Sequence, residues 1–199
     1  MSKIVWAAIA LLGMLAAGGI AKAQSQNRAS EKPTISSVLD RQLSIEEREF
    51  TSAAEAMPAD KYNFAPTSGD FKGVRNFGAE VRHVASFNYL FYSEILGQKP
   101  PAGSGAEGPE NVNTKDEILK YLHDSFILGH RAIASITPGN ALIVLPKAAP
   151  PTINTRLAVA VLACVHDNDH YGQMVEYLRM NGIVPPATAA AQSRARGSK

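Results

Sequence analysis

The sequence has very little cysteine and no compositional bias, and these absences exclude several classes of protein. One cysteine, Cys164, is present among 199 residues, so a framework of intramolecular disulfides is excluded. Twelve prolines and 15 glycines are too few for a collagen or a low-complexity chain. With 45% hydrophobic residues, the composition is that of a single globular domain that is stabilised by its own core.

The sequence also lacks an excess of charge of one sign. The formal net charge is +2, but Lys3 and Lys22 lie in an N-terminal segment that we expect to be removed. Without them, 18 basic and 18 acidic side chains remain. Binding to a phosphate backbone depends on a basic excess, so nucleic acid is not expected as a partner.

The one long apolar run lies at the N-terminus. Lys3 precedes residues 4–20, which are apolar or small throughout, and a small-x-small site follows at residues 21–23. This pattern predicts a signal peptide over residues 1–23 and an exported protein, periplasmic or secreted, without a stable membrane anchor after cleavage. An uncleaved anchor helix is the alternative, because 17 apolar residues approach the lower limit for spanning a bilayer.

Helical periodicity recurs in four segments, at about residues 35–57, 74–96, 114–133 and 154–180. Thr114 and Glu117 form a capping-box pattern at the start of the third segment. The pattern predicts an all-α fold, a four-helix bundle over residues 34–186, with long loops at 58–73, 97–113 and 134–153. Only residues 141–145 resemble a strand, and residues 187–199, which have no apolar pattern, are expected to form a disordered tail.

Three histidines form the candidate site. His166 and His170 are four residues apart, so both imidazoles stand on one face of the fourth helix, and nearby Leu162 and Tyr177 suggest that this face looks inward. His83 in the second helix is the candidate third ligand. Three neutral imidazoles and one vacant position suit zinc, nickel or a similar divalent ion in a site of the catalytic type.

Each histidine also has an ordinary structural interpretation. A pair of histidines four residues apart is also typical of an ordinary polar patch, and a single histidine such as His83 is more often a buried, hydrogen-bonded imidazole than a ligand. His123 and His130 are seven residues apart on the third helix and are interpreted as surface or interface residues. We read Cys164 as a small buried residue that faces away from the ion.

Two other metal chemistries fit the sequence less well. A zincin places Glu directly after the first His, whereas Asp167 follows His166, and no further histidine follows His170. A di-iron bundle needs Glu-x-x-His on two helices. Glu80 and His83 satisfy that spacing once, but the other helix has Asp in place of Glu.

Four motifs carry a resemblance to a known family. They are AMPADKYNFAPT at residues 56–67, VRHVA at 81–85 followed by Asn88, HDNDHYGQ at 166–173 and LRMNGIVPP at 178–186. In these motifs the chain resembles the DinB-like (DinB/YfiT) metalloenzyme superfamily, over about residues 34–186. The resemblance implies a four-helix bundle of up-down-down-up topology, with a metal ion on His83, His166 and His170.

The resemblance also implies a range of functions. Members are often dimeric, and characterised relatives include thiol-dependent S-transferases and a maleylpyruvate isomerase. The leading hypothesis is an exported metal-dependent enzyme, a transferase or hydrolase, that acts on a small molecule such as a thiol. The alternatives are a non-catalytic bundle that binds a metal or small ligand, and histidines that only fill the core. Arg82 and Asp167 are candidates for orienting the ligands, and Tyr62 and Phe64 for lining a pocket.

Overall fold

The computed structural model describes residues 32–146 and 152–197. Its elements are α2 (Ile35–Ala56), the 3-10 turn η1 (Ala59–Lys61), α3 (Phe77–Leu96), α4 (Lys115–Ala134), α5 (Arg156–Met180) and α6 (Pro186–Gly197). The described chain contains no strand beyond an isolated bridge between Val144 and Thr155, so the expected all-α class is confirmed. The predicted signal peptide lies outside the described residues, and no described helix has the length and apolarity needed to cross a membrane.

The helices begin at residues whose side chains cap them. Asn76 Oδ1 accepts a hydrogen bond from the backbone N–H of Ala79, 2.8 Å away, at the start of α3. The predicted capping box at α4 is confirmed, because Thr114 accepts from the Glu117 backbone and the Glu117 carboxylate accepts from the Thr114 backbone. Such bonds satisfy donors that a helix start would otherwise leave without a partner.

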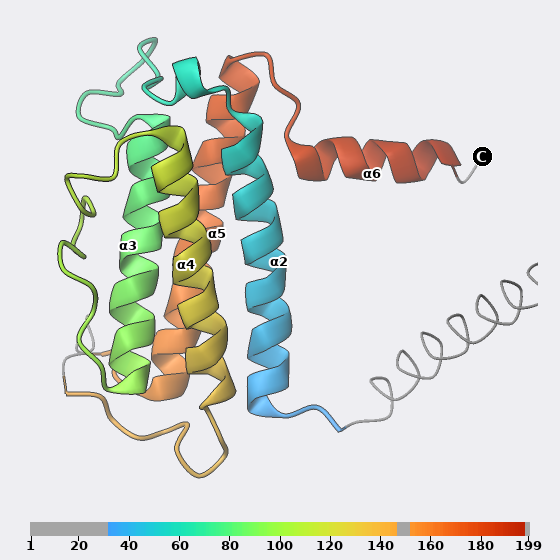
Figure 1. The fold of residues 1–199 in the computed structure, drawn as a ribbon. Helices are drawn as coiled ribbons and strands as arrows, with labels where there is room; N and C mark the ends of the chain where they lie inside the picture. Colours follow the sequence, from blue (N-terminus) through green and yellow to red (C-terminus); the bar gives the residue numbers. More distant parts are fainter. Residues whose placement is uncertain (1–31, 147–151, 198–199) are drawn as a thin grey trace, which may run out of the picture. The chain divides into compact units, whose positions relative to one another are not determined.

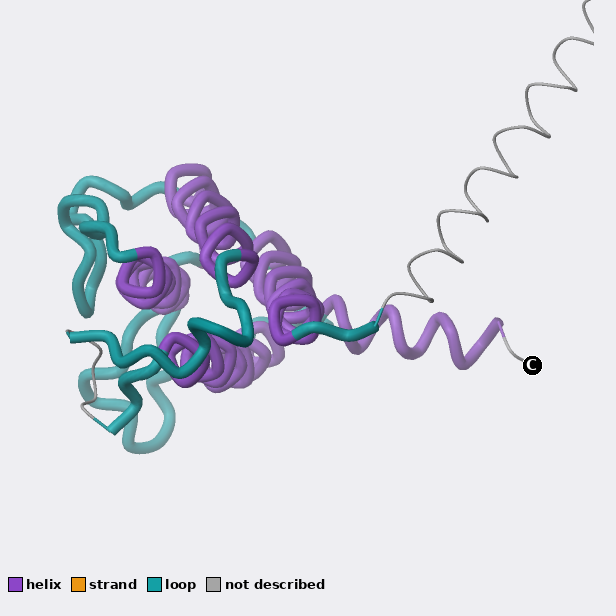
Figure 2. The backbone as a smooth tube through the Cα atoms, turned by 90° about the horizontal axis from the view of Figure 1, so that it is seen from below, coloured by secondary structure: helices purple, strands orange, loops and turns teal. Residues whose placement is uncertain are grey.

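Helices α2, α3, α4 and α5 pack around one shared core (Figures 1 and 2). Helix α3 contacts α4 and α5, and α2 contacts the same two helices. Large apolar and aromatic side chains from all four are fully buried between them, among them Phe50, Phe77, Tyr92, Phe126 and Met174. This core fixes the relative positions of α3 and α5, which carry the candidate ligands.

A glycine and a histidine define the contact between α2 and α4. A Cβ on Gly129 would lie 2.7 Å from Tyr92 Cε2 and 3.0 Å from Leu43 Cδ2, so only glycine fits this approach. One residue later, His130 Nδ1 and Nε2 lie 2.6 and 3.1 Å from carboxylate oxygens of Asp40 and Glu47 on α2. Burial alone would lower the pKa of His130, but its hydrogen bonds to these two carboxylates outweigh burial and raise it.

The long loop between α3 and α4 runs alongside α3 (Figure 1). Arg82 Nε donates to the carbonyl oxygen of Glu107 over 2.7 Å, and its Nη1 donates to the Val112 carbonyl oxygen over 3.0 Å. Ser86 Oγ exchanges hydrogen bonds of 2.7 and 2.8 Å with the backbone of Gly105. The loop is therefore held against α3 at residues 105–113, next to His83.

The expected disordered tail is helical in the structure. Helix α6 spans Pro186–Gly197 and has no buried residue. The missing apolar stripe agrees with this lack of burial, but it does not exclude a helix. Alanine has the highest helix propensity and proline is favoured at the first helical position, and both are present here.

Candidate metal centre

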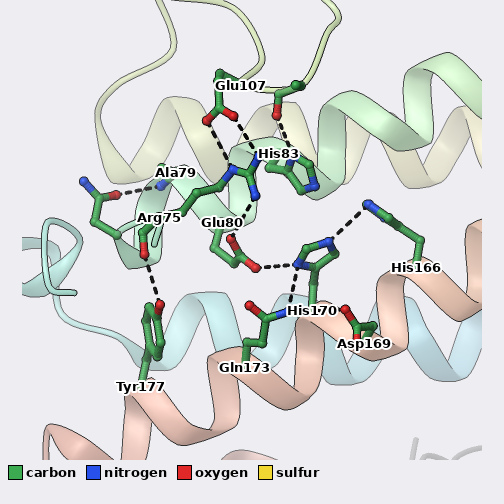
Figure 3. Close-up of polar contacts among 12 residues, drawn as sticks. Arg75, Ala79, Glu80, His83, Glu107, His166, Asp169, His170, Gln173 and Tyr177 are labelled. Atoms are coloured by element: carbon green, nitrogen blue, oxygen red, sulfur yellow. Dashed lines mark hydrogen bonds and ion pairs between the residues drawn. The ribbon is translucent and has the colours of Figure 1, made fainter. Parts of the chain in front are cut away.

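His83 of α3 and His166 and His170 of α5 lie together (Figure 3). Each offers one ring nitrogen, and these three atoms are all within 4.8 Å of one another. The Nε2 atoms of His166 and His170 are 3.2 Å apart. Nitrogens held about 2.0–2.1 Å from a tetrahedral zinc ion lie about 3.4 Å from each other, so the trio fits an ion after small movements of the side chains.

Glu80 orients His170. The His170 Nδ1 donates to Glu80 Oε1, and the Glu80 side chain is only 3% exposed. Because a carboxylate can only accept, the proton is placed on Nδ1 and Nε2 keeps its lone pair. A carboxylate behind a histidine is the usual arrangement that fixes the ring of a metal ligand.

The loop from α3 to α4 orients His83 in the same way. His83 Nδ1 donates to the backbone carbonyl oxygen of Ala106, so its Nε2 is the nitrogen available to an ion. The ring is buried. Two of the three imidazoles are thus held by their outer nitrogens, one by a buried carboxylate and one by a loop carbonyl.

The environment keeps two of the rings neutral. Burial, followed by the neighbouring His170 and His83 rings, lowers the pKa of His166 to about 3. Burial is also the main cause that lowers the pKa of His83. Neutral imidazole is the form that binds a metal ion. Phe87 and Phe91 lie against His166, with ring centroids 4.8 and 5.8 Å away, and exclude water from one side of the cluster.

Arg75 lies at the edge of the site and contacts two carboxylates. Its Nη1 is 4.0 Å from Glu80 Oε2. Its Nη2 and Nε donate to the two carboxylate oxygens of Glu107, over 2.7 and 3.2 Å. Tyr177 donates to the Arg75 backbone carbonyl over 3.1 Å. Arg75 thus connects the loop to the Glu80–His170 pair (Figure 3).

The other residues suggested by the sequence have different roles. Arg82 fastens the loop at Glu107 and Val112, and none of the hydrogen bonds that it makes within the described ranges goes to a candidate ligand. Asp167 is fully buried, and its two carboxylate oxygens have no hydrogen-bond partner in the part of the chain that the structure describes. Burial, followed by the nearby charge of Glu46, raises the pKa of its carboxyl well above the usual value. Among the described residues, no other His, Cys, Asp or Glu joins the three-histidine cluster.

Four more residues that the sequence singled out lie outside the metal centre: two aromatic side chains that pack against others, the buried cysteine and an exposed histidine. Tyr62 is buried, donates to the Ala54 carbonyl over 2.8 Å and stacks edge-on against Phe77. Phe64 packs against Tyr177. Cys164 is buried, as expected, and burial raises the pKa of its thiol to about 12. His123 is exposed on α4.

Sequence reasoning missed Arg75, Glu107 and the carbonyl of Ala106. Glu80 was considered only as one half of a di-iron motif, and its contact with His170 on another helix was not anticipated. The available signal was its position one turn before His83 on an inward face, where a buried carboxylate needs a partner. No spacing rule reveals the loop residues, because their contact with α3 depends on the path of the loop.

The fold and the site together define a class: an all-helical protein in which three histidines from two helices are placed to hold a divalent ion. The sequence matches the DinB superfamily over residues 42–174, more than half of the chain. The protein belongs to the DinB superfamily.

A solved structure supports the same fold. The chain is similar to a conserved protein from Enterococcus faecalis, with a TM-score of 0.60 and 18% sequence identity, over 74% of this chain and 97% of the other. At this identity the likeness supports the fold alone. No curated protein matches the sequence.

Proposed function

We propose that this DinB superfamily protein binds one divalent ion, zinc or nickel, through His83, His166 and His170, and uses it as an exported enzyme of the thiol-dependent transferase or hydrolase type. One observation carries the proposal. Three imidazoles converge, and the outer nitrogens of two of them are held by Glu80 and by the loop carbonyl of Ala106. Histidines that only filled the core would not need a buried carboxylate to direct a free Nε2 at two other rings.

The site favours an open coordination position. Three protein ligands leave a fourth position for water or substrate, whereas structural zinc sites are closed by four protein ligands. A bound divalent ion would lower the pKa of a water or thiol there and supply a nucleophile near neutral pH. His166 is only partly buried, so a small molecule can approach beside it, while Phe87 and Phe91 cover part of its ring.

The remaining parts of the proposal rest on the sequence and the helix neighbours. The up-down-down-up bundle is supported by the contacts of α2 and α3 with both α4 and α5, and by the long connection along α3 (Figure 1). Export is supported by the apolar segment and cleavage pattern of residues 1–23. The proposal includes a homodimer, which size measurements of the full chain in solution would test.

A non-catalytic metal-binding bundle is the second candidate. It uses the same three histidines, and the observation in its favour is that the carboxylate in contact with them, Glu80, is buried and hydrogen-bonded to His170, so it is not placed to act as a general base. Retained metal with no turnover in thiol-transfer and hydrolysis assays would favour this candidate over the enzyme.

The direct test is the metal content of the purified full chain. We expect one equivalent of a divalent ion in the wild type and in a His123→Ala control, which removes an exposed histidine of α4. The His166→Ala/His170→Ala double variant should lose the ion while circular dichroism still reports a helical protein. Equal metal content in the double variant and the control would refute the site.

A further inference from the structure

Arg75 uses different edges for its two carboxylate partners. Its Nη1 faces Glu80, which is buried and committed to His170. Its Nε and Nη2 edge holds both oxygens of Glu107 in a two-pronged arrangement. This is the geometry in which a guanidinium recognises a carboxylate of a ligand as well as that of a side chain.

The two carboxylates differ in how easily each can leave. The Glu80 side chain is 3% exposed, whereas that of Glu107 is 61% exposed, and the Arg75 side chain is 29% exposed. An exposed carboxylate that leaves its partner is hydrated at once, so displacing it costs less free energy than displacing a buried carboxylate, which would leave an unpaired buried charge. The outer edge of Arg75 can therefore exchange its carboxylate, and the inner edge cannot.

The backbone around Glu107 is held independently of its side chain. The carbonyl oxygen of Glu107 accepts from Arg82 Nε, and that of the preceding Ala106 accepts from His83. Ser86 fixes Gly105 in the same stretch. The Glu107 side chain can swing into solvent while the loop keeps its contact with His83, so exchange does not require the candidate ligands to move.

We propose that Arg75 is the docking residue for a carboxylate group on the small molecule that binds at the three-histidine centre, and that Glu107 occupies this position until the ligand displaces it. The proposal rests on the proposed metal site. Arg75 lies beside His83 and the Glu80–His170 pair (Figure 3), so a molecule held by its carboxylate presents its other end to the ion. The ligand class is a small carboxylic acid that carries a second, metal-binding group such as a thiol.

The test compares two thiols on the cobalt(II)-loaded full chain at low ionic strength. 3-Mercaptopropionate carries a carboxylate and 2-mercaptoethanol does not, and near-ultraviolet absorption from cobalt–thiolate bonds reports the binding of both. We expect the wild type to bind 3-mercaptopropionate about tenfold more tightly than 2-mercaptoethanol, the effect of about one charge-assisted contact.

Three variants separate docking from general electrostatics. Glu107→Gln removes the competing carboxylate and should increase the preference for 3-mercaptopropionate. Arg75→Lys keeps a charge near Glu80 but loses the planar fork, and should reduce the preference. Asp124→Asn removes an exposed carboxylate that pairs with Lys120 on α4, and should leave the preference as in the wild type.

The two proposals fail in different ways. A cobalt–thiolate band with equal affinities for both thiols, in the wild type and in Glu107→Gln, would overturn the docking role of Arg75 and leave the metal site standing. A shift in Asp124→Asn equal to that in Glu107→Gln would overturn it as well, because the effect would then be one of net charge. The absence of any cobalt–thiolate band would overturn both proposals.

Discussion

Substitution of Glu80 tests the site specifically, because Glu80 contacts the candidate ligand His170 but is not itself a candidate ligand. Its carboxylate accepts from His170 Nδ1 and lies 4.0 Å from Arg75 Nη1. Glu80→Gln preserves the shape and one acceptor oxygen but removes the negative charge. The His170 ring should keep its orientation and lose the electrostatic support that makes Nε2 a stronger donor to an ion.

The expected magnitude follows from the burial of Glu80. Since its side chain is 3% exposed, water cannot replace the lost carboxylate. Loss of a group that hydrogen-bonds to a metal-ligating histidine lowers the metal affinity by about 10- to 100-fold, or about 1.4–2.8 kcal/mol. We expect Glu80→Gln near the lower end, because an acceptor remains, and Glu80→Ala near the upper end, because His170 Nδ1 then has none.

The assay is a zinc titration of the metal-free full chain in competition with a chromophoric chelator. The control, Glu176→Gln, removes an exposed carboxylate of α5 that pairs with Arg179, so it matches the change in net charge and should bind zinc as the wild type does. Wild-type affinity in a folded Glu80→Ala variant would refute the role of Glu80, and with it the tautomer assigned to His170.

Two further predictions concern the packing of α4 against its neighbours. His130→Gln should lower the free energy of unfolding most below pH 6.5, the ordinary His value, and progressively less as the pH rises through the raised folded pKa of His130. Chemical denaturation between about pH 5.5 and 9 measures this difference. A difference that does not change with pH would contradict the ion-pair account. Gly129→Ala should cost about 1–3 kcal/mol of unfolding free energy, because its Cβ would lie 2.7 Å from a ring carbon of Tyr92. Its control, Gly172→Ala, meets no atom within 4 Å and should stabilise α5 by about 0.5–1 kcal/mol; equal effects of the two substitutions would refute the close approach.

Local sequence signals predicted the helices well. The third segment begins at the Thr114 capping box as predicted, and the second ends at Gly97, whose φ of 66° lies in the left-handed region that favours glycine. Periodicity placed the start of α3 at Val74, whereas Asn76 is the cap. The two boundaries differ because a capping side chain marks the start of a helix more specifically than an apolar residue does.

The site was predictable only where it lies on helices. The i, i+4 spacing and the family resemblance predicted His166, His170 and His83 as candidate metal ligands. The structure places the three together. The contacts of Glu80, Arg75 and Ala106 were not predicted, because each joins segments that are far apart in the sequence. Proximity in sequence was no guide for Asp167, which is next to a candidate ligand but is fully buried and lies outside the three-histidine cluster.

The central claim is a single ion on three imidazoles, and X-ray absorption spectroscopy of the zinc-loaded full chain tests it most directly. The account predicts three histidine nitrogens at about 2.0–2.1 Å and a further light-atom ligand, with one zinc per chain. The His83→Ala variant should lose one imidazole from that shell. A sulfur ligand at about 2.3 Å, which Cys164 would supply, or a shell that is unchanged in His83→Ala, would contradict the account.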